Sequence, residues 1–221
     1  MTFLGRGRAP GSGTAVRLPS DGLLVLAGLA LLVLSSPWVD EDHLSAIERG
    51  VFRAVNGLPS VIYRPMWVFM QLGNFLVVPA AVLVALIVRK WRLATGLLLG
   101  GLITYGLAKV VKRIVTRGRP TTLLDDIHIH GTPSYGLGFV SGHAAVVATL
   151  ITIAWPWLSR PARIVVVVLG LAVCVGRVYV GAHFPLDIVG GVGLGVAVGG
   201  LVRLILGRPA AGTAEPAGHT G

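Results

Sequence analysis

The sequence is short of charged side chains. Only 13% of its 221 residues are charged, whereas 54% are hydrophobic, and the mean hydropathy is +0.80. Soluble domains carry about a quarter charged residues, so this chain lacks the polar surface that would cover a soluble globule. The composition therefore predicts an integral membrane protein, and the length suits one domain.

Cysteine and acidic residues are also scarce. Cys174 is the single cysteine and lies within an apolar run, so it can form no internal disulfide and is expected to pack. Lys and Arg outnumber Asp and Glu by 19 to 9. A basic excess can indicate nucleic-acid binding, but these arginines are spread between apolar segments and form no basic stripe. No nucleic-acid partner is expected.

Apolar segments are abundant, and each is close to the ~20 residues that a membrane-spanning helix needs. They cover residues 22–39, 66–88, 93–115, 140–157, 163–180 and 185–206. The sequence predicts an all-α protein, a six-span transmembrane helix bundle in one domain over 21–207. The polar ends, 1–20 and 208–221, are predicted to be disordered cytoplasmic tails.

Two segments allow more than one interpretation. The first apolar run could be a signal peptide, but no small-residue cleavage site follows Leu34, which favours a retained span. Between the first two runs, apolar residues recur at helical spacing: Leu44, Ile47, Val51, Phe52 and Val55. This pattern predicts a short amphipathic helix, either interfacial on the membrane surface or a partly buried connection.

Basic residues near the span ends set the orientation. With a cytoplasmic N-terminus, 10 cations lie inside and 9 outside. The outer set contains the candidates for phosphate binding, and without them the inside excess is clear. The sequence predicts a multi-pass protein of the cell membrane with both termini in the cytoplasm.

Basic residues cluster at the end of the third apolar segment. Lys109, Lys112 and Arg113 share one helix face. Pro120 ends the helix and favours extended backbone geometry at Arg119. The chain therefore turns back at Arg119 instead of continuing onward. Arg offers a planar fork for phosphate oxygens and Lys a mobile point charge. By itself, this cluster could equally hold basic side chains that reach to the membrane boundary.

A small polar turn opens the fourth apolar segment. Ser141 is a good helix N-cap, Gly142 allows close backbone approach, and His143 stands beside them. The free N–H groups of a helix N-terminus attract an anion, to which the histidine could donate a proton. A plain cap with an interfacial histidine is the alternative.

The turn between the last two segments concentrates polar residues at membrane depth. Arg177 lies near the end of one apolar span, and His183 follows. Pro185 suits the first turn of the next helix, which places Asp187 in that turn. An Asp four residues from a His can hold one ring nitrogen and leave the other as a nucleophile. Charge at this depth is a candidate functional site.

The three stretches share one side of the membrane by span count alone. Their motifs, K-x6-R-P, S-G-H and R-x5-H-x3-D, together resemble the type 2 phosphatidic acid phosphatase superfamily, which also includes vanadium haloperoxidases and bacterial acid phosphatases. Two flanking positions depart from the family pattern: Val140 stands where the family usually has Pro, and Gly176 where it usually has Ser.

The resemblance implies a role for each residue. It implies that His183 is the phosphohistidine nucleophile, that Asp187 orients it, and that His143 protonates the leaving group. The implied phosphate-binding residues are Lys112, Arg119, Ser141, Gly142 and Arg177. No metal and no other cofactor are expected.

The function expected from these observations is hydrolysis of a lipid phosphate or diphosphate on the extracytoplasmic side. Polyprenyl diphosphate, phosphatidate and phosphatidylglycerol phosphate all suit the site as substrates. A lipid-linked phosphotransferase and a non-catalytic lipid-phosphate binder or transporter are the alternatives. The oligomeric state stays open.

Other polar groups are expected to be bystanders. His128 and His130, beside Asp125 and Asp126, resemble a loose metal cluster, but a solvated loop is the preferred interpretation. Tyr105 and Tyr179 are expected to pack. The glycines of the last segment favour close helix packing; they are Gly190, Gly191, Gly193, Gly195, Gly199 and Gly200.

Overall fold

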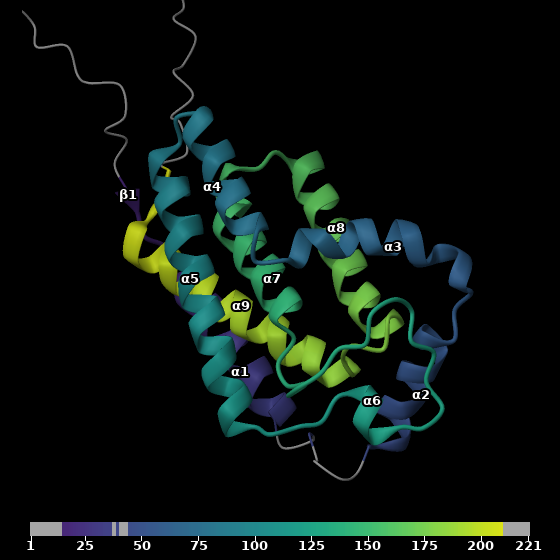
Figure 1. The fold of residues 1–221 in the computed structure, drawn as a ribbon. Coiled ribbons are helices and arrows are strands. Elements are labelled where there is room, and N and C mark those ends of the chain that lie inside the picture. Colours follow the sequence, from purple (N-terminus) through teal and green to yellow (C-terminus); the bar gives the residue numbers. More distant parts are fainter. Residues whose placement is uncertain (1–14, 37–38, 40–43, 210–221) are drawn as a thin grey trace, which may run out of the picture.

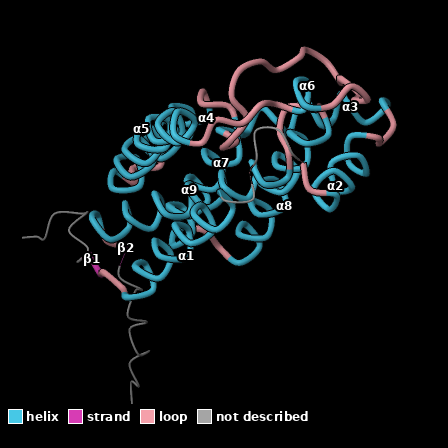
Figure 2. The backbone as a smooth tube through the Cα atoms, turned by 90° about the horizontal axis from the view of Figure 1, so that it is seen from below, coloured by secondary structure: helices cyan, strands magenta, loops and turns pink. Residues whose placement is uncertain are grey.

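The computed structural model describes residues 15–36, 39 and 44–209. Within these residues the fold is all-α, and the only strands are the two-residue β1 and β2 (Figures 1 and 2). In chain order the elements are β1 (Ala15–Val16), α1 (Pro19–Ser35), α2 (Ala46–Asn56), η2 (Ser60–Ile62), α3 (Tyr63–Met70), η3 (Gln71–Gly73), α4 (Val77–Ile87), α5 (Trp91–Ile114), α6 (Pro120–Leu123), α7 (Gly142–Ala154), η4 (Trp155–Trp157), α8 (Arg160–Tyr179), α9 (Pro185–Leu206) and β2 (Arg208–Pro209).

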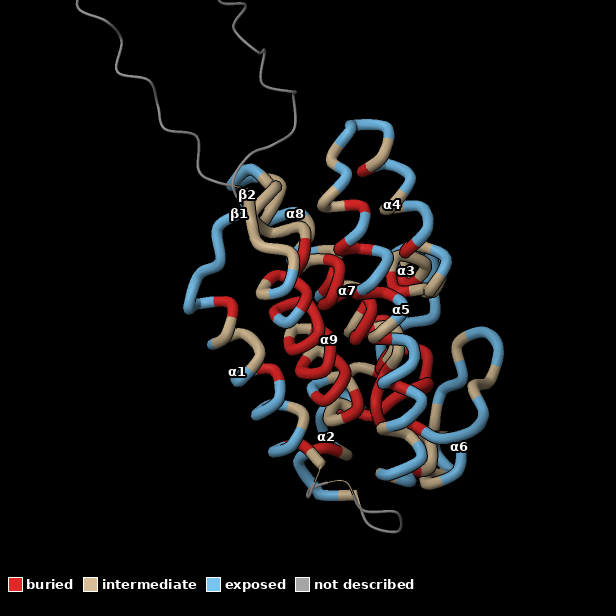
Figure 3. The backbone as a smooth tube through the Cα atoms, turned by 90° about the vertical axis from the view of Figure 1, so that its left-hand side faces the viewer, coloured by how far each residue is buried: buried red, intermediate tan, exposed pale blue. Residues whose placement is uncertain are grey.

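Helix α9 forms the centre of the bundle. It packs against α1 on one side and α7 on another, and α5 packs against α7 and α9. In Figure 3 most of α7 and α9 is buried, whereas α1 and α4 expose much of their length. Their exposed residues are largely Leu, Val and Ile, which suits helices that face lipid.

Glycine makes the two closest helix contacts possible. A Cβ on Gly193 of α9 would come within 2.8 Å of the backbone of Gly28 in α1, and one on Gly195 would collide with the backbone of Ala145 in α7. Small residues let helix backbones approach in this way. The expectation that these glycines serve packing agrees with the structure.

Several apolar segments have the length to cross a membrane. Three described helices, α5, α8 and α9, are long and apolar enough, and the bent pair Ser60–Gly73 and Val77–Ile87 would make a fourth span. Helices α1 and α7 are apolar but shorter. The six predicted segments all form apolar helices, and the structure is that of an integral membrane protein.

The segment predicted as one span over 66–88 is two helices. They meet at a 66° bend. At the break, the side-chain oxygen of Asn74 accepts a hydrogen bond from the N–H of Leu76 (3.1 Å). Gly73 lies against His143 of α7, because a Cβ there would come within 2.9 Å of the His143 Cβ. The prediction of a single continuous helix was wrong, because this backbone turns to pass the end of α7.

The predicted amphipathic helix is α2. Ser45 caps it by accepting a hydrogen bond from the N–H of Glu48 (3.1 Å). Phe52 is fully buried against α8 and α9, whereas Ile47 is 82% exposed and Val51 is 48% exposed. The helix is therefore a packed connection that also presents apolar side chains outward. The acidic run at 40–43 lies outside the described residues.

The two ends of the described chain meet at one end of the bundle. There β1 pairs with β2, and Asp21 is buried between Arg203 and Arg208, with an N···O distance of 2.6 Å to each. The predicted disordered tails lie mostly outside the described residues. Their described parts, 15–20 and 208–209, form β1, the start of α1 and β2.

Candidate active site

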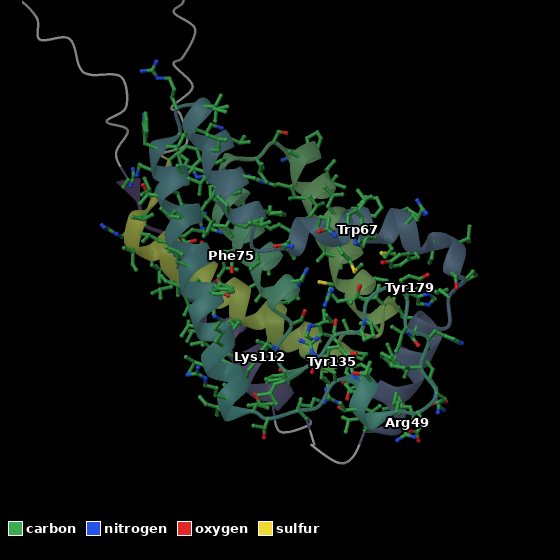
Figure 4. The ribbon with its side chains drawn as sticks, viewed as in Figure 1. Arg49, Trp67, Phe75, Lys112, Tyr135 and Tyr179 are labelled. Atoms are coloured by element: carbon green, nitrogen blue, oxygen red, sulfur yellow. The ribbon has the colours of Figure 1, made fainter. Side chains whose placement is uncertain are left out.

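The three predicted stretches meet at the end of the bundle opposite β1 and β2 (Figure 1). Two hydrogen bonds join them directly: from Arg119 to the carbonyl oxygen of Ala182 (2.8 Å), and from the N–H of Ser141 to the carbonyl oxygen of Asp187 (2.9 Å). Lys112 donates to the carbonyl oxygen of Gly138 (3.0 Å), which lies in the loop before Ser141. In Figure 4, Lys112 lies at the lower end of α5, near the loop that carries Tyr135.

The three cations of the site contact neutral groups. Lys112 and Arg119 donate to carbonyl oxygens, and the Arg177 guanidinium lies 4.0 Å from the sulfur of Met70. Among the described residues none of the three forms a salt bridge with a carboxylate. The Nε atoms of Arg119 and Arg177 are buried without a hydrogen-bond partner there. Buried donors of this kind favour an anion.

The start of α7 adds more donors. Ser141 is its N-cap, and its hydroxyl is buried without a hydrogen-bond partner among the described residues. A Cβ on Gly142 would meet nothing within 4 Å, so the first turn is open on that side. This helix end can bind a negatively charged oxygen.

His183 and Asp187 form a buried pair across the α8–α9 turn. The Nδ1 atom of His183 lies 3.4 Å from Oδ2 of Asp187, and the same oxygen accepts the N–H of Phe184 (2.9 Å). Burial, followed by the charges of Arg177 and Arg119, lowers the pKa of His183 well below its usual value. The ring is therefore neutral at physiological pH, which is the form that can attack phosphorus.

His143 lines a cavity of about 220 Å³. The cavity lies between the break before α4, helix α5 and the start of α7, and its walls are mostly apolar. It is lined by Gly73, Asn74, Phe75, Thr104, Tyr105, Ala108, Gly142, His143 and Val146. The cavity therefore offers a mostly apolar space beside the His143 ring.

The comparisons agree with this geometry. The profile of the PAP2 superfamily matches residues 89–209. The chain belongs to the PAP2 superfamily. It is 29% identical over 119 residues to a decaprenylphosphoryl-5-phosphoribose phosphatase of Mycobacterium tuberculosis, an alignment that covers 54% of this chain and 63% of that protein. The chain thus matches less than two thirds of the length of this relative.

Two solved structures share the fold. LpxE of Aquifex aeolicus superposes with a TM-score of 0.68 at 25% identity, covering 74% of this chain and 98% of that one. The transmembrane PAP2-type phosphatidylglycerolphosphate phosphatase of Bacillus subtilis superposes with a TM-score of 0.62 at 24% identity, covering 84% and 95%. Family membership, predicted from the three motifs, is confirmed.

The two departures from the PAP2 pattern are accounted for by packing. Val140 is fully buried, 3.0 Å from where a Cβ on Gly190 would lie. At Gly176, an added Cβ would lie 2.7 Å from a side-chain carbon of Met70. Neighbouring side chains therefore fill the space around both positions.

Two residues that the sequence analysis did not select lie in the same site. Arg117 and Glu48 are both buried, and Arg117 contacts Glu48 and Asp187. The pattern Ser45-x-x-Glu48 matches a helix capping box. That pattern alone explains a glutamate at position 48, so the sequence gives no sign of a second role. Arg117 and the exposed Arg113 both lie in the basic stretch at the end of the third apolar segment. The sequence therefore does not show that Arg117 is buried.

His128 is exposed, as expected for a solvated loop, whereas His130 is partly buried, contrary to that expectation. His130 stacks on Tyr179, with ring centroids 4.1 Å apart, and its Nε2 lies 3.1 Å from the carbonyl oxygen of Asn56. Tyr105 lies beneath the Lys109 ammonium at 4.2 Å. Within the described residues, no three His, Cys, Asp or Glu side chains form a group that could hold a metal ion.

Proposed function

We propose that this protein is a membrane-embedded phosphatase of lipid phosphates or diphosphates. The observation that carries the proposal is the combination of three cations that have no carboxylate partner among the described residues and a buried histidine–aspartate pair. Three positive charges match a phosphate dianion and the charge that builds on its oxygens in the transition state. The homologues, which act on lipid-linked phosphates by their names, support the same class.

The chemistry follows from the two histidines. The lone pair of His183 Nε2 attacks phosphorus while the bond to the leaving oxygen breaks, and that oxygen takes its proton from His143. Asp187 stabilises the positive charge that the His183 ring gains. Water then gives a proton to the now neutral His143 and attacks phosphorus, the P–N bond to His183 breaks, and phosphate leaves. The residues supply this cycle with no metal or other cofactor.

We further propose that six segments cross the cell membrane, with the site on the extracytoplasmic side. A lipid would keep its tails in the bilayer and present its phosphate at membrane depth. Polyprenyl diphosphate, phosphatidate and phosphatidylglycerol phosphate fit this requirement. The mostly apolar cavity beside His143 suits the alcohol side of such substrates.

The test is phosphate release by the purified full-length protein. Wild type, His183→Ala, His143→Ala and the surface control Asp126→Asn would be assayed with these three lipids in detergent. We expect His183→Ala to lose roughly 10³-fold or more of the activity, Asp126→Asn to match wild type, and vanadate to inhibit. Lipid binding without phosphate release by wild type would instead support a binder or transporter.

Phosphate release that persists in His183→Ala would overturn the mechanism. Product analysis with added alcohol acceptors separates hydrolysis from phosphotransfer. Hydrolysis predicts free phosphate in proportion to the substrate consumed, whereas phosphotransfer predicts a phosphorylated acceptor.

A further inference from the structure

Arg117 is the largest fully buried side chain among the described residues, and it lies between two carboxylates. Its guanidinium forms a two-pronged pair with Glu48, through Nη1 to Oε1 (3.1 Å) and Nη2 to Oε2 (2.7 Å). The same Nη1 donates to Oδ1 of Asp187 (3.1 Å). A buried cation fits here because it is paired on both sides.

Glu48 connects the surface helix α2 to the start of α9. Its side chain is 4% exposed, and its Oε1 also accepts the N–H of Leu186 in the first turn of α9 (2.9 Å). The carboxylate thus satisfies one free donor of the helix that carries Asp187. Its contacts explain why a charged residue occurs on the buried face of α2.

The two oxygens of Asp187 have different partners. Oδ1 accepts from Arg117, while Oδ2 accepts the N–H of Phe184 and faces Nδ1 of His183. Arg117 thereby fixes the rotation of the carboxylate and leaves one oxygen for the histidine. This arrangement keeps the proton of the neutral ring on Nδ1 and the lone pair on Nε2.

The charges of this group also matter. One guanidinium and two carboxylates leave a net negative charge beside His183. Without Glu48, Arg117 and Asp187 would neutralise each other. The other groups that act on His183 are cations and a second histidine, namely Lys112, Arg119, Arg177 and His143. The negative charge of the buried group opposes them when the attacking ring becomes cationic.

We propose that Glu48 and Arg117 are positioning residues for the nucleophile His183, acting through Asp187. Arg117 orients the Asp187 carboxylate, and Glu48 balances Arg117 so that the charge of Asp187 remains directed at the ring. This inference rests on the proposed function, because it assigns a role within the same reaction. Neither residue is proposed to touch the phosphate.

Glu48→Gln separates charge from shape. The amide keeps the size of the side chain and an oxygen that can accept from Leu186, but it removes the negative charge. We expect kcat to fall about 10- to 100-fold, by analogy with the partners that orient metal-binding histidines, with KM little changed. The acid limb of the kcat/KM profile should move to lower pH, because loss of a nearby negative charge disfavours the protonated His183 ring.

Asp126→Asn is the matched control. It also removes an arginine–carboxylate pair that joins α2 to another segment, through Arg53 (2.6 Å), but this pair is exposed to solvent. The variant should keep the wild-type kcat, KM and pH profile. Glu48→Asp restores the charge and should return the acid limb toward its wild-type position, which a purely structural role would not predict.

The outcomes distinguish the inference from the proposed function. If wild type releases phosphate and His183→Ala does not, but Glu48→Gln matches Asp126→Asn in kcat and in its acid limb, the inference is overturned. If wild type releases no phosphate, the proposed function itself fails. If Glu48→Gln does not fold, Arg117→Lys gives the test, because Lys keeps the charge but cannot hold both carboxylates. An unchanged kcat in Arg117→Lys would contradict the inference.

Discussion

The arginines at the site, one fully buried and two partly buried, fall into two kinds. Arg117 is held by two carboxylates, whereas Arg119 and Arg177 contact neutral acceptors within the described residues. Burial of an unpaired charge is costly, so the second kind needs an anion to offset that cost. This difference in pairing indicates that Arg117 holds the site in shape, whereas Arg119 and Arg177 are expected to bind the substrate phosphate.

Arg177→Lys tests this distinction. Lys keeps the positive charge but loses the planar fork that matches phosphate oxygens. We expect KM for a lipid phosphate and the inhibition constant of vanadate to rise about 10-fold or more, which corresponds to one charge-assisted hydrogen bond. Both constants would be measured on the purified protein.

Arg113→Lys is the control for this substitution. Arg113 is exposed in the last turn of α5, and the same exchange there should leave both constants unchanged. Equal effects at the two positions would show that Arg177 has no special contact with phosphate.

Sequence reasoning identified eight of the residues that meet in this site but missed two. Motif spacing found the groups whose chemistry has no simple structural explanation, such as His183 and Asp187. Glu48 and Arg117 were missed because each has a simple structural explanation. Glu48 occupies a capping-box position, and Arg117 could be a cation at the membrane boundary. Their pairing joins positions 69 residues apart, and no local pattern predicts a contact at that separation.

At the scale of helices, close contact between α7 and α9 sets the position of two of the proposed catalytic groups. His143 lies in the first turn of α7 and Asp187 in the first turn of α9. The helices approach where Gly195 faces the backbone of Ala145. Any side chain on that glycine would separate the two helices and move His143 and Asp187 apart.

Gly195→Ala should therefore destabilise the protein. Overpacking of a tight contact costs about 1–3 kcal/mol, and we expect a lower unfolding temperature in detergent together with lower activity. Gly106→Ala is the control, since a Cβ at this position of α5 would meet nothing within 4 Å. Helix propensity predicts a neutral or slightly stabilising effect there. Equal melting temperatures for the two variants would contradict the packing account.

The break before α4 was beyond sequence reasoning. Residues 66–88 are almost continuously apolar, and hydropathy cannot distinguish one helix from two. Pro65 and Pro79 occupy the first turns of α3 and α4, where proline is tolerated, so neither marks the bend. The bend depends on Gly73 meeting α7, which is a tertiary contact.

For the whole molecule, the distribution of apolar segments predicted the helical bundle and the gathering of the motifs at one end. The apolar segments alone do not determine how many of the helices cross the bilayer. Helices α1 and α7 are shorter than a full span, so their crossing depends on how the whole bundle sits in the membrane. The proposed absolute orientation rests on the inside excess of cations that remains once the phosphate-binding candidates are set aside.

Thiol labelling in whole cells tests the proposed orientation. With Cys174 replaced by Ser, a single cysteine would be introduced at Tyr135, which is 78% exposed in the site-end loop, or at Arg160, which is exposed at the opposite end. A membrane-impermeant maleimide should label Tyr135→Cys in intact cells. It should label Arg160→Cys only after permeabilisation, and the reverse pattern would contradict the orientation.

The central claim is that His183 is the nucleophile. The most direct test is to react the protein with a ³²P-labelled lipid phosphate and to quench the reaction rapidly. The label that remains on the protein is then measured after acid treatment and after base treatment. A phosphohistidine survives base and is lost in acid, so we predict base-stable label on wild type, mapped by peptide sequencing to His183 and absent from His183→Ala. Base-stable label on another residue, or unchanged labelling of an active His183→Ala protein, would contradict the account.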